Sequence, residues 1–372
     1  MEKIDRVDVW AREIPLGVHF PTSYKDGAGG GERYVSHHVF VRILAGELIG
    51  WGEGTELPMF TGGTSSTMAE IIRTQFAPLM IGSTIDRAFQ IFHKTVMGHP
   101  HNPGAKLGLE LALYDLLAKT RSCPLSDLLG RRRIDKIPLC YHIGAVPLDE
   151  AVVQARGAID AGFKTLKLKA DGNIPKDVER ILAVMDVLSS DALLRVDANQ
   201  GWENFRKAGE ALHELAWERR LEYIEQPVNR DHTEDMRKLS DQFGIPIFAD
   251  ESVVGPEEAM HLVESNLVDG LCIKVAKCGS LSQGVLIANI AAMRRIPVTP
   301  VSAFATSLGA SAELQMLSVM PLLSSAVELC HYMLSEDPGR PKLPFAPLIS
   351  IPEGVGTGAE LEEDAFLPNS RC

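Results

Sequence analysis

The sequence predicts an α/β protein in which a closed βα barrel follows an α+β segment. From about Ile137 onward, short apolar segments recur at a spacing of roughly 25 residues, and stretches with helical periodicity lie between them. An open doubly wound sheet would favour a glycine-rich phosphate-binding turn after its first strand, whereas residues 142–147 contain a single glycine. Eight parallel-type strands therefore favour the closed barrel. The predicted strands are Leu139–Ile143, Thr165–Lys169, Leu193–Asp197, Glu222–Glu225, Pro246–Ala249, Gly270–Lys274, Pro297–Thr299 and Ala326–Leu329.

The part of the chain before the barrel predicts a smaller α+β domain, because strand-like runs come first and helical periodicity follows. The expected strands are Ile4–Trp10, His37–Leu44 and Leu48–Glu53, and the expected helices are Ser66–Met80, Ile85–Met97 and Ala105–Lys119. We therefore place the first domain at residues 1–130 and the barrel at residues 131–335. The tail, residues 336–372, contains six prolines and is expected to return across the surface to the first domain.

Composition and charge restrict the class of protein. The chain has 372 residues with 37 basic and 49 acidic side chains, a net charge of −12. Its sequence pI is near 5.4, so its electric field repels phosphate and argues against binding nucleic acid or an anionic membrane. We find neither the apolar N-terminal core of a secretory signal nor an apolar run long enough to span a bilayer. Six dispersed cysteines without a CxxC pair indicate reduced thiols, so we expect a cytoplasmic enzyme.

Five successive predicted strands end in an ionisable residue, and chemistry in a βα barrel takes place at the carboxyl ends of the strands. These residues follow one another at intervals of 24 to 28, about one βα unit each. Any one of them alone is typical of a solvated charge or a helix cap. The same position filled five times in a row predicts an active site. The five residues are Lys169, Asp197, Glu225, Asp250 and Lys274.

The three acidic strand ends, Asp197, Glu225 and Asp250, are expected to face one small volume. Three carboxylates remain ionised together only when a cation neutralises them. Oxygen ligands without nearby His or Cys favour Mg²⁺, with Mn²⁺ as the alternative. Asn199 is a candidate to hold a bound water or the substrate. Glu251 either supports the ligands or belongs to the start of the next helix.

Lysines flank the acidic residues. Lys167 and Lys169 are two apart on a strand, so both side chains project from the same face. Neighbouring ammonium groups and partial burial lower the pKa of a lysine, which predicts that one of the pair acts as a base near pH 7. Lys274 ends a strand on the other side of the barrel, so a substrate carboxylate would lie with one lysine on each face of its α-carbon. The alternative for the pair is an exposed strand end.

These motifs resemble a known family, the muconate-lactonizing subgroup of the enolase superfamily, which uses a Lys or His base and Mg²⁺. The resemblance covers nearly the whole chain and includes Gly50–Glu53 and Pro124–Gly130 in the first domain. One departure is Gly279-Ser280, where the family commonly has two glycines. The motifs that carry the resemblance are Lys167-Leu168-Lys169, Asp197-Ala198-Asn199, Glu225-Gln226-Pro227, Asp250-Glu251-Ser252 and Lys274-Val275-Ala276-Lys277-Cys278-Gly279.

The resemblance implies a modified (β/α)₇β barrel with an α+β capping domain, which the N-terminal segment and the tail build together. It also implies that Asp197, Glu225 and Asp250 bind the metal ion. Lys169 and Lys274 become the acid and base that remove and return an α-proton of a small-molecule carboxylate, and Lys277 is expected to lie behind the ligands with Glu251. Relatives commonly form symmetric homo-oligomers, so a homo-oligomer is expected here.

The reactions of this subgroup share the strand-end residues, so only the eighth strand and the capping loops can indicate which reaction this chain catalyses. Dipeptide epimerases typically have Asp-x-Asp in the eighth strand, where this chain has Glu328 and Cys330. Glu328 together with Thr61–Thr64 looks more like the muconate cycloisomerase branch. Two alternatives stay open for Glu328: it holds a substrate cation, as an amino-acid or betaine racemase needs, or it is a structural carboxylate.

The capping loops also suggest how the pocket is shaped. Phe20, Tyr24 and Phe60 either line the substrate pocket or pack the two domains together. Residues 17–33 include the run Gly27–Gly31, which is too rich in glycine to pack as a helix or strand. This loop is either an ordinary surface loop or a mobile lid.

We conclude that the chain is a metal-dependent isomerase, which either cyclises a dicarboxylic, muconate-like acid or transfers a proton at the α-carbon of a carboxylate. The leading alternative is a lyase that dehydrates an acid sugar or a hydroxy amino acid, with Lys169 removing the α-proton. A carboxylate-binding protein without turnover is the alternative from another class. The presence of both lysines and all three acidic ligands disfavours it, because binding alone needs no base on either face.

Overall fold

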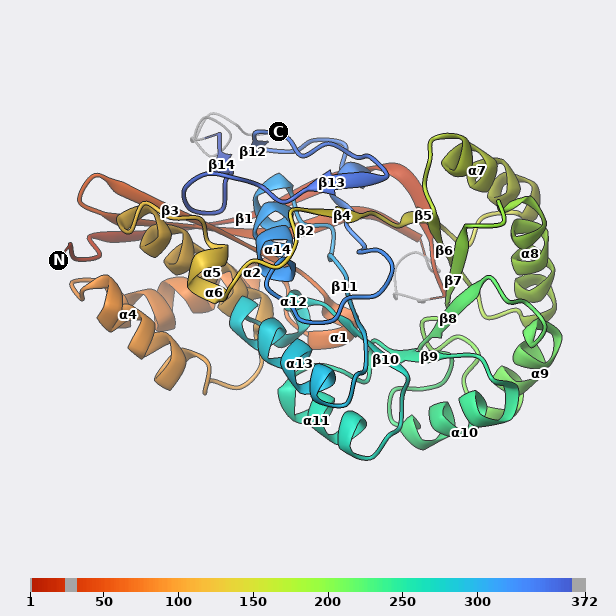
Figure 1. Cartoon of the computed structure of the whole chain (residues 1–372). Coiled ribbons are helices and arrows are strands. Elements are labelled where there is room, and N and C mark those ends of the chain that lie inside the picture. Colours follow the sequence, from red (N-terminus) through yellow and green to blue (C-terminus); the bar gives the residue numbers. More distant parts are fainter. Residues whose placement is uncertain (1, 24–31, 363–372) are drawn as a thin grey trace.

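The computed structural model describes residues 2–23 and 32–362, in which a barrel lies beside a smaller domain (Figure 1). Seven parallel strands form one sheet in the order of the sequence. β6 and β7 have the predicted bounds, whereas β10 ends one residue before Lys274. The strands are β5 (Tyr141–Ile143), β6 (Thr165–Lys169), β7 (Leu193–Asp197), β8 (Leu221–Glu225), β9 (Ile247–Ala249), β10 (Gly270–Ile273) and β11 (Val298–Pro300).

The eighth predicted strand, Ala326–Leu329, is not a regular strand but still closes the barrel. Val327 bridges to Leu139 beside β5, and Glu328 bridges to Val301 beside β11. The backbone N–H of Cys140 donates to Val327 O at 2.9 Å, and the N–H of Ser302 donates to Glu328 O at 2.7 Å. Because each neighbour pairs over a single bridge, no ladder long enough for a strand forms. Glu328 nevertheless occupies the eighth position of the barrel.

Helices cover the outside of the barrel and connect its strands (Figure 1). Several begin where the sequence places a capping side chain: Asn173, Asn204 and Ser280 each accept a hydrogen bond from a backbone N–H in the first turn of α8, α9 and α13. The helices are α7 (Leu148–Asp160), α8 (Ile174–Val187), α9 (Phe205–Leu215), α10 (Thr233–Phe243), α11 (Pro256–Glu264), α12 (Val275–Cys278), α13 (Leu281–Met293) and α14 (Ser307–Leu317).

The capping domain consists of a three-stranded antiparallel sheet and helices that pack on it. Two predicted helices, Ser66–Met80 and Ile85–Met97, each contain a π-helical turn. The sheet consists of β1 (Arg6–Pro21), β2 (Glu32–Ala45) and β3 (Leu48–Thr55). The helical segments are α1 (Pro58–Thr61), α2 (Ser65–Ile71), η1 (Ile72–Phe76), α3 (Ala77–Met80), α4 (Ile85–Ile91), η2 (Phe92–Val96), α5 (Pro103–Thr120) and α6 (Ser126–Leu129).

Helix α5 lies directly against β3 because β3 alternates glycine with larger residues. A Cβ at Gly50, Gly52 or Gly54 would collide with backbone carbonyls of α5. The missing side chains let the two backbones approach each other closely. This approach fixes α5 between the capping sheet and the barrel.

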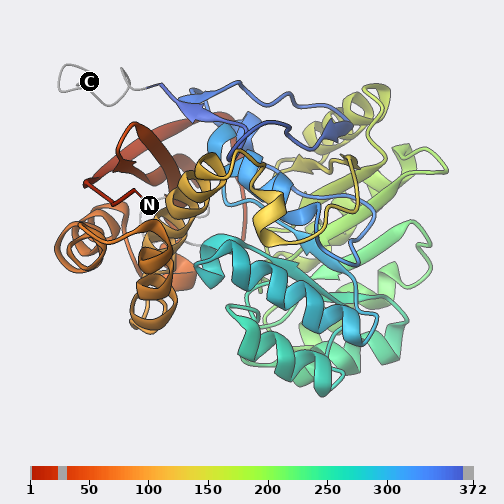
Figure 2. The ribbon, with the colours of Figure 1, turned by 60° about the vertical axis from the view of Figure 1, so that its left-hand side comes forward.

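The tail returns to the capping domain. The N–H of Thr357 donates to Asp115 of α5 at 2.9 Å, and Lys119 forms an ion pair with Glu360 at 2.5 Å. Leu361 packs with Trp51 of the capping sheet. Figure 2 shows this segment, in blue, running across both parts of the molecule. Its short elements are η3 (His331–Met333), β12 (Gly339–Arg340), β13 (Leu348–Ser350), which pairs with β4 (Lys136–Pro138), and β14 (Glu360–Leu361), which pairs with β12.

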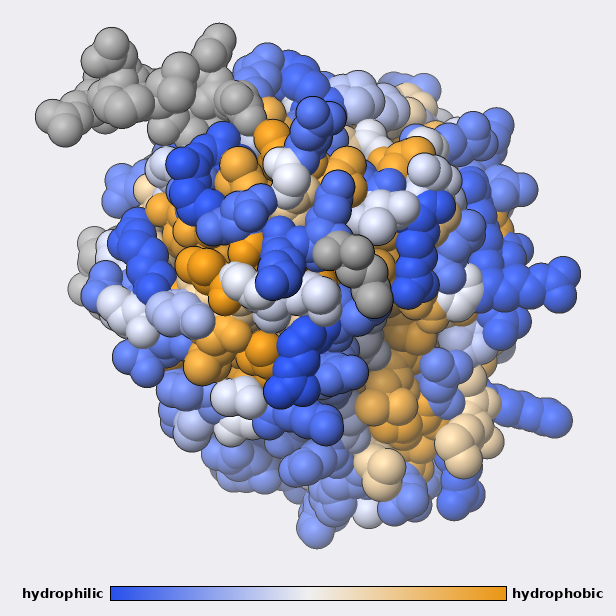
Figure 3. All heavy atoms as spheres, turned by 90° about the vertical axis from the view of Figure 1, so that its left-hand side faces the viewer, coloured by the Kyte–Doolittle hydropathy of each residue, from blue (hydrophilic) through white to orange (hydrophobic). Residues whose placement is uncertain are grey.

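The face of the capping domain that points away from the barrel carries hydrophilic and hydrophobic side chains interspersed with one another (Figure 3). None of the helices in the described part of the chain has the length and apolar character needed to cross a membrane. The five cysteines within that part, Cys123, Cys140, Cys272, Cys278 and Cys330, are free thiols.

Candidate active site

The ionisable strand ends meet at one end of the barrel. Lys169 pairs in register with Asp197 across β6 and β7, and Asp197 pairs with Glu225 across β7 and β8. Asp250 directly follows β9, and Lys274 directly follows β10. The three acidic residues are fully buried. The structure therefore brings together the five residues that the sequence singles out.

Each lysine at this end contacts a carboxylate. Lys167 Nζ lies 2.6 Å from Glu225 Oε2, 2.6 Å from Glu328 Oε2 and 3.2 Å from Asp197 Oδ2. Lys169 Nζ donates to Asp197 Oδ2 at 2.5 Å and to Asn199 Oδ1 at 3.0 Å. Lys274 Nζ donates to Asp250 Oδ2.

These contacts lower the pKa of two of the three carboxylates but not that of the third. Burial alone would raise the pKa of Asp197, but the charges of Lys169 and Lys167 outweigh burial and hold the pKa below its usual value. Burial is likewise outweighed at Asp250, where Lys274 and Lys277 lower the pKa to about 2. Burial and the charge of Asp197 raise the pKa of Glu225 to about 8. Without a further positive charge, the third carboxylate therefore tends to take up a proton.

The same contacts correct one expectation about the lysines. Burial lowers the pKa of Lys167, but Glu225, Glu328 and Asp197 raise it well above its usual value. The expectation that Lys167 and Lys169 depress each other's pKa is therefore wrong for Lys167, because three carboxylates surround its ammonium group. The pKa of Lys274 is also raised, since the charges of Asp250 and Glu225 outweigh the effect of its burial.

The acidic residues fit a divalent cation in their chemistry. Within residues 2–23 and 32–362, no three His, Cys, Asp or Glu side chains are already arranged around one point as metal ligands, and lysine ammonium groups lie against the acids. Glu225 Oε1 is buried and has no hydrogen-bond partner. A buried, unpartnered carboxylate oxygen next to two further carboxylates is a donor set that suits Mg²⁺.

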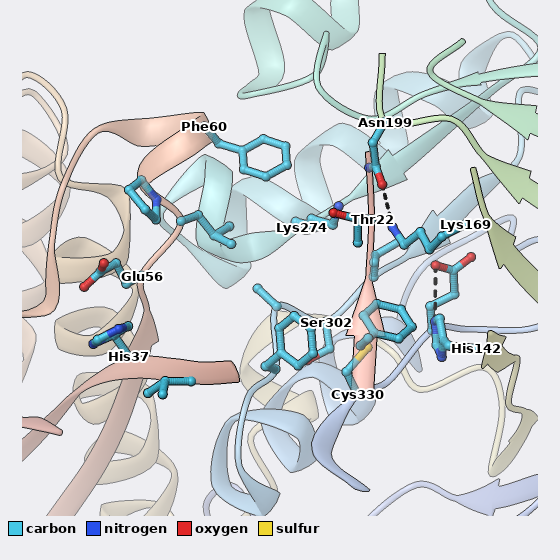
Figure 4. Close-up of a pocket in the computed structure, with 18 of the residues that line it drawn as sticks. Thr22, His37, Glu56, Phe60, His142, Lys169, Asn199, Lys274, Ser302 and Cys330 are labelled. Carbon is cyan, nitrogen blue, oxygen red and sulfur yellow. Dashed lines mark hydrogen bonds and ion pairs between the residues drawn. The ribbon is translucent and has the colours of Figure 1, made fainter. Parts of the chain in front are cut away.

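A cavity of about 410 Å³ opens above these residues between the barrel and the capping domain (Figure 4). We use the term barrel wall for Lys167, Lys169, Asn199, Lys274 and Glu328, and capping wall for Phe20, Val35, Leu57 and Phe60, all of which line the cavity. β6 and β10 are four positions apart in a barrel closed by an eighth segment. Lys169 and Lys274 therefore project into the cavity from opposite sides.

Glu328 joins four elements beneath the cavity. Its Oε1 accepts hydrogen bonds from Arg195 Nη1 at 2.9 Å and from the Tyr223 hydroxyl at 3.1 Å, while its Oε2 accepts one from Lys167. Burial raises the pKa of Glu328, but Lys167, His142, whose Nε2 lies 3.6 Å from Oε2, and Arg195 lower it well below its usual value. The cations around Glu328 thus come from the protein itself. These contacts favour the structural carboxylate among the alternatives for this residue.

The other predicted residues fall into four groups. Phe20 and Phe60 line the cavity, and the Phe60 ring lies 5.2 Å from Lys274 Nζ. Lys277 donates to Asp250, and Glu251 Oε1 accepts from Asn199 at 3.3 Å, so both lie behind the acidic cluster. Tyr24 and the run Gly27–Gly31 lie outside the described residues. Thr61–Thr64 does not line the cavity: Thr61 bonds to Leu57 O, and Thr64 caps α2.

Sequence reasoning missed three buried residues around Glu328. Arg195 and Tyr223 are each two residues before a strand-end acid, and His142 lies in β5 and lines the cavity. The alternation of a strand carried the necessary signal, because residues two apart share a face. Reading inward from each strand end would have found Arg195 and Tyr223.

Comparisons with known proteins show which family the chain is similar to. The family model described as enolase C-terminal domain-like matches residues 150–365, and the mandelate racemase/muconate lactonizing enzyme N-terminal domain matches residues 30–130. The chain is 31% identical to an L-Lys-D/L-Arg epimerase of Desulforapulum autotrophicum over 78% of this chain and 79% of the relative. It is 29% identical to a chloromuconate cycloisomerase of Cupriavidus necator over 98% of this chain and 97% of the relative.

Solved structures show the same similarity. The N-succinyl Arg/Lys racemase of Bacillus cereus has a TM-score of 0.90 and 26% identity, covering 98% of this chain and 97% of that one. A dipeptide epimerase of Enterococcus faecalis, complexed with Mg and the dipeptide L-Leu-L-Tyr, has a TM-score of 0.87 and 27% identity, covering 96% and 99%.

Proposed function

The chain belongs to the mandelate racemase/muconate lactonizing enzyme family of the enolase superfamily, and we propose that it is an isomerase that transfers a proton at the α-carbon of a small carboxylic acid. The observation that carries the proposal is the position of Lys169 and Lys274 on opposite sides of one cavity. A lysine that removes the proton from one face and a second lysine that returns a proton to the other face invert the α-carbon.

Asp197, Glu225 and Asp250 would hold a divalent metal ion, Mg²⁺ in our proposal and Mn²⁺ as the alternative, because their oxygens are buried beside the cavity. When bound, this ion stabilises the negative charge that the substrate carboxylate gains as the α-proton leaves. A positioned base contributes only about 3–5 kcal/mol. Lys167 holds Glu225 and Glu328 in place rather than serving as the base, because its ammonium group lies between three carboxylates, whereas Lys169 and Lys274 each contact one.

Cycloisomerisation of a dicarboxylic acid is the second candidate. Glu328 and Cys330 stand where dipeptide epimerases carry Asp-x-Asp, and the similar proteins include a chloromuconate cycloisomerase. In that reaction only one of the two lysines exchanges a proton with the substrate. The two candidates therefore differ in how many faces of the α-carbon exchange.

Incubating the enzyme with Mg²⁺ and a panel of carboxylic acids in deuterated water tests the proposal. The panel should include both enantiomers of N-acylated amino acids, dipeptides and muconate. We expect deuterium at the α-carbon and conversion of each enantiomer of the preferred acid into the other. Ring closure of muconate without α-exchange of any chiral acid would support the cycloisomerase, and loss of water would support the lyase.

The proposal extends to the setting of the enzyme. We place the capping domain at residues 1–130 with the tail and the barrel at residues 131–335, in line with the contacts of Thr357 and Glu360 to α5. The free thiols suit a cytoplasmic location. We also propose a homo-oligomer, on the ground that members of the family commonly form symmetric homo-oligomers. Sedimentation equilibrium checks the assembly, and a monomer would exclude it.

A further inference from the structure

One carboxylate of the capping domain binds the start of a barrel helix. Glu110 of α5 is fully buried, and its Oε1 accepts hydrogen bonds from the hydroxyls of Ser280 at 2.6 Å and Ser282 at 2.8 Å. Its Oε2 accepts one from the backbone N–H of Leu281 at 2.6 Å. A negative charge at the N-terminal end of a helix interacts favourably with the helix dipole. Glu110 thus binds the first turn of α13 from outside the barrel.

The same capping helix also contacts the residue before this turn. Gly279 has a φ of 75° and ends the one-turn helix α12, and a Cβ there would lie 3.0–3.1 Å from atoms of Pro103 at the start of α5. A side chain at this position would be strained and would press against α5. Pro103 and Glu110 therefore bind α12 and the start of α13 to two successive parts of one helix.

Helix α12 sets the position of Lys274. Lys274 is the residue that precedes α12, and its carbonyl accepts the N–H of Lys277 at 2.9 Å. Lys274 and Lys277 both donate to Asp250. A shift of α12 by a fraction of an ångström would move both ammonium groups relative to the substrate. Lys169, in contrast, lies within the regular strand β6 on the other side of the cavity.

We propose that Glu110 is a positioning residue through which the capping domain holds Lys274 on its side of the cavity. The inference rests on the proposed function, because Lys274 serves one particular face of the substrate α-carbon only if the enzyme transfers an α-proton. It also gives Ser280 a role at the position where the family commonly has glycine. The Ser280 side chain caps α13 by accepting from Gln283 N at 3.1 Å and simultaneously donates to Glu110.

Two substitutions and a matched control test the proposal. Glu110→Gln keeps the size of the side chain and removes the charge that the carboxylate carries above about pH 7, so the assays are run above that pH. Ser280→Gly removes one donor without adding bulk. Asn204→Gly is the control, because Asn204 caps α9 in the same way at a helix that follows neither lysine. Each variant is assayed with Mg²⁺ for the rate of α-deuterium exchange from each enantiomer, and for amide hydrogen exchange across residues 274–283.

Misplacing one catalytic group slows its own step strongly. We expect Glu110→Gln to slow exchange on the face served by Lys274 by about 10-fold or more, with less than about 2-fold change on the other face. Ser280→Gly should act in the same direction and more weakly, and Asn204→Gly should not distinguish the faces. Equal slowing of both faces, or no change on either, overturns the proposal, because a purely structural role would not select one face.

The amide measurement separates this inference from the proposed function. If the wild-type enzyme exchanges the α-proton of no acid in the panel, the proposed function fails irrespective of Glu110. Faster amide exchange over residues 274–283 in Glu110→Gln, absent from Asn204→Gly, would still support the link between α5 and α12. Unchanged amide exchange in that segment would overturn the link itself.

Discussion

The barrel wall and the capping wall face each other across the same cavity, yet they differ in charge and in origin. The barrel wall carries three lysines and Glu328, held by ion pairs between different strands. The capping wall presents the aromatic and aliphatic side chains of Phe20, Val35, Leu57 and Phe60. The barrel wall is charged and held by ion pairs, and the capping wall is apolar, although Thr22, His37 and Glu56 of the capping domain also line the cavity.

This difference assigns separate tasks to the two walls. Buried charges are costly unless each is paired, so every member of the barrel wall depends on its neighbours. Apolar contacts on the capping wall act more independently, and their loss changes binding in small steps. We therefore expect substitutions in the barrel wall to affect stability and the reaction together, and substitutions in the capping wall to affect the choice of substrate.

Removing the metal ion should have the largest effect. Exhaustive chelation would leave the three buried carboxylates without the cation that we propose for them, and it should lower the rate of α-exchange by at least about 10³-fold. Adding Mg²⁺ back should restore the rate. An undiminished rate in metal-free enzyme, verified by elemental analysis, would contradict the role that we assign to the acidic residues of the barrel.

Glu328→Gln should destabilise the protein by about 3–5 kcal/mol, because it removes the counter-charge shared by the buried cations Lys167 and Arg195. Urea unfolding measures this change. The matched control is Glu222→Gln, since Glu222 also binds Arg195 but its side chain is 16% exposed and water can replace it. An equally large change in both variants would contradict the special position of Glu328.

The contact between Glu110 of the capping domain and α13 of the barrel should make the stability of the protein depend on pH. Burial, only partly opposed by hydrogen bonds from Ser280, Ser282 and Leu281, raises the pKa of Glu110 from 4.5 to about 7. The folded state then binds the proton more tightly than the unfolded state, so this contribution to stability is complete below pH 4.5 and is lost as the pH rises to about 7.

Glutamine does not titrate, so the difference between the variant and the wild type isolates this effect. From pH 4.5 to pH 7, the stability of the wild type relative to Glu110→Gln should fall by about 3 kcal/mol. Urea unfolding of both proteins across this range measures the difference. A difference that stays constant with pH would contradict the assigned shift in pKa.

Phe60→Leu should have the smallest effect and the most selective one. Its ring lines the capping wall, so the change should alter kcat/KM by about 10-fold or less, and by different factors for different acids. Phe243→Leu, in a partly buried aromatic residue packed against the core of the barrel, is the matched control and should leave the ranking of substrates unchanged. A uniform loss for all acids in Phe60→Leu would mean that Phe60 serves the reaction rather than specificity.

The ionisable strand ends could be predicted from the sequence because their signal repeats. Lys169, Asp197 and Glu225 each end a short apolar strand, and the strands recur at the spacing of one βα unit. Local sequence also determines the caps of the following helices, such as Asn173 and Ser280. Because the pattern repeats, each strand-end residue made the prediction for the next strand end more secure.

The features that the sequence did not predict depend on contacts between segments far apart in the chain. Residues 17–21 of the expected loop 17–33 belong to strand β1, because pairing with β2 resumes at Phe20 and Pro21 after a register shift and because the Ala145 N–H donates to Pro21 O at 2.8 Å. The eighth barrel segment fails to form a regular strand although its apolar run predicts one. The bond from Ser280 to Glu110 spans 170 positions, so no local pattern announces it.

The most direct test of the account compares Lys169→Ala with Lys274→Ala, each loaded with Mg²⁺. The rate of α-deuterium exchange is measured for both enantiomers of one good substrate. We predict complementary losses: each variant fails to remove the α-proton of one enantiomer and still removes that of the other. If either variant exchanges both enantiomers at rates close to the wild type, the two lysines do not serve opposite faces and the account is wrong.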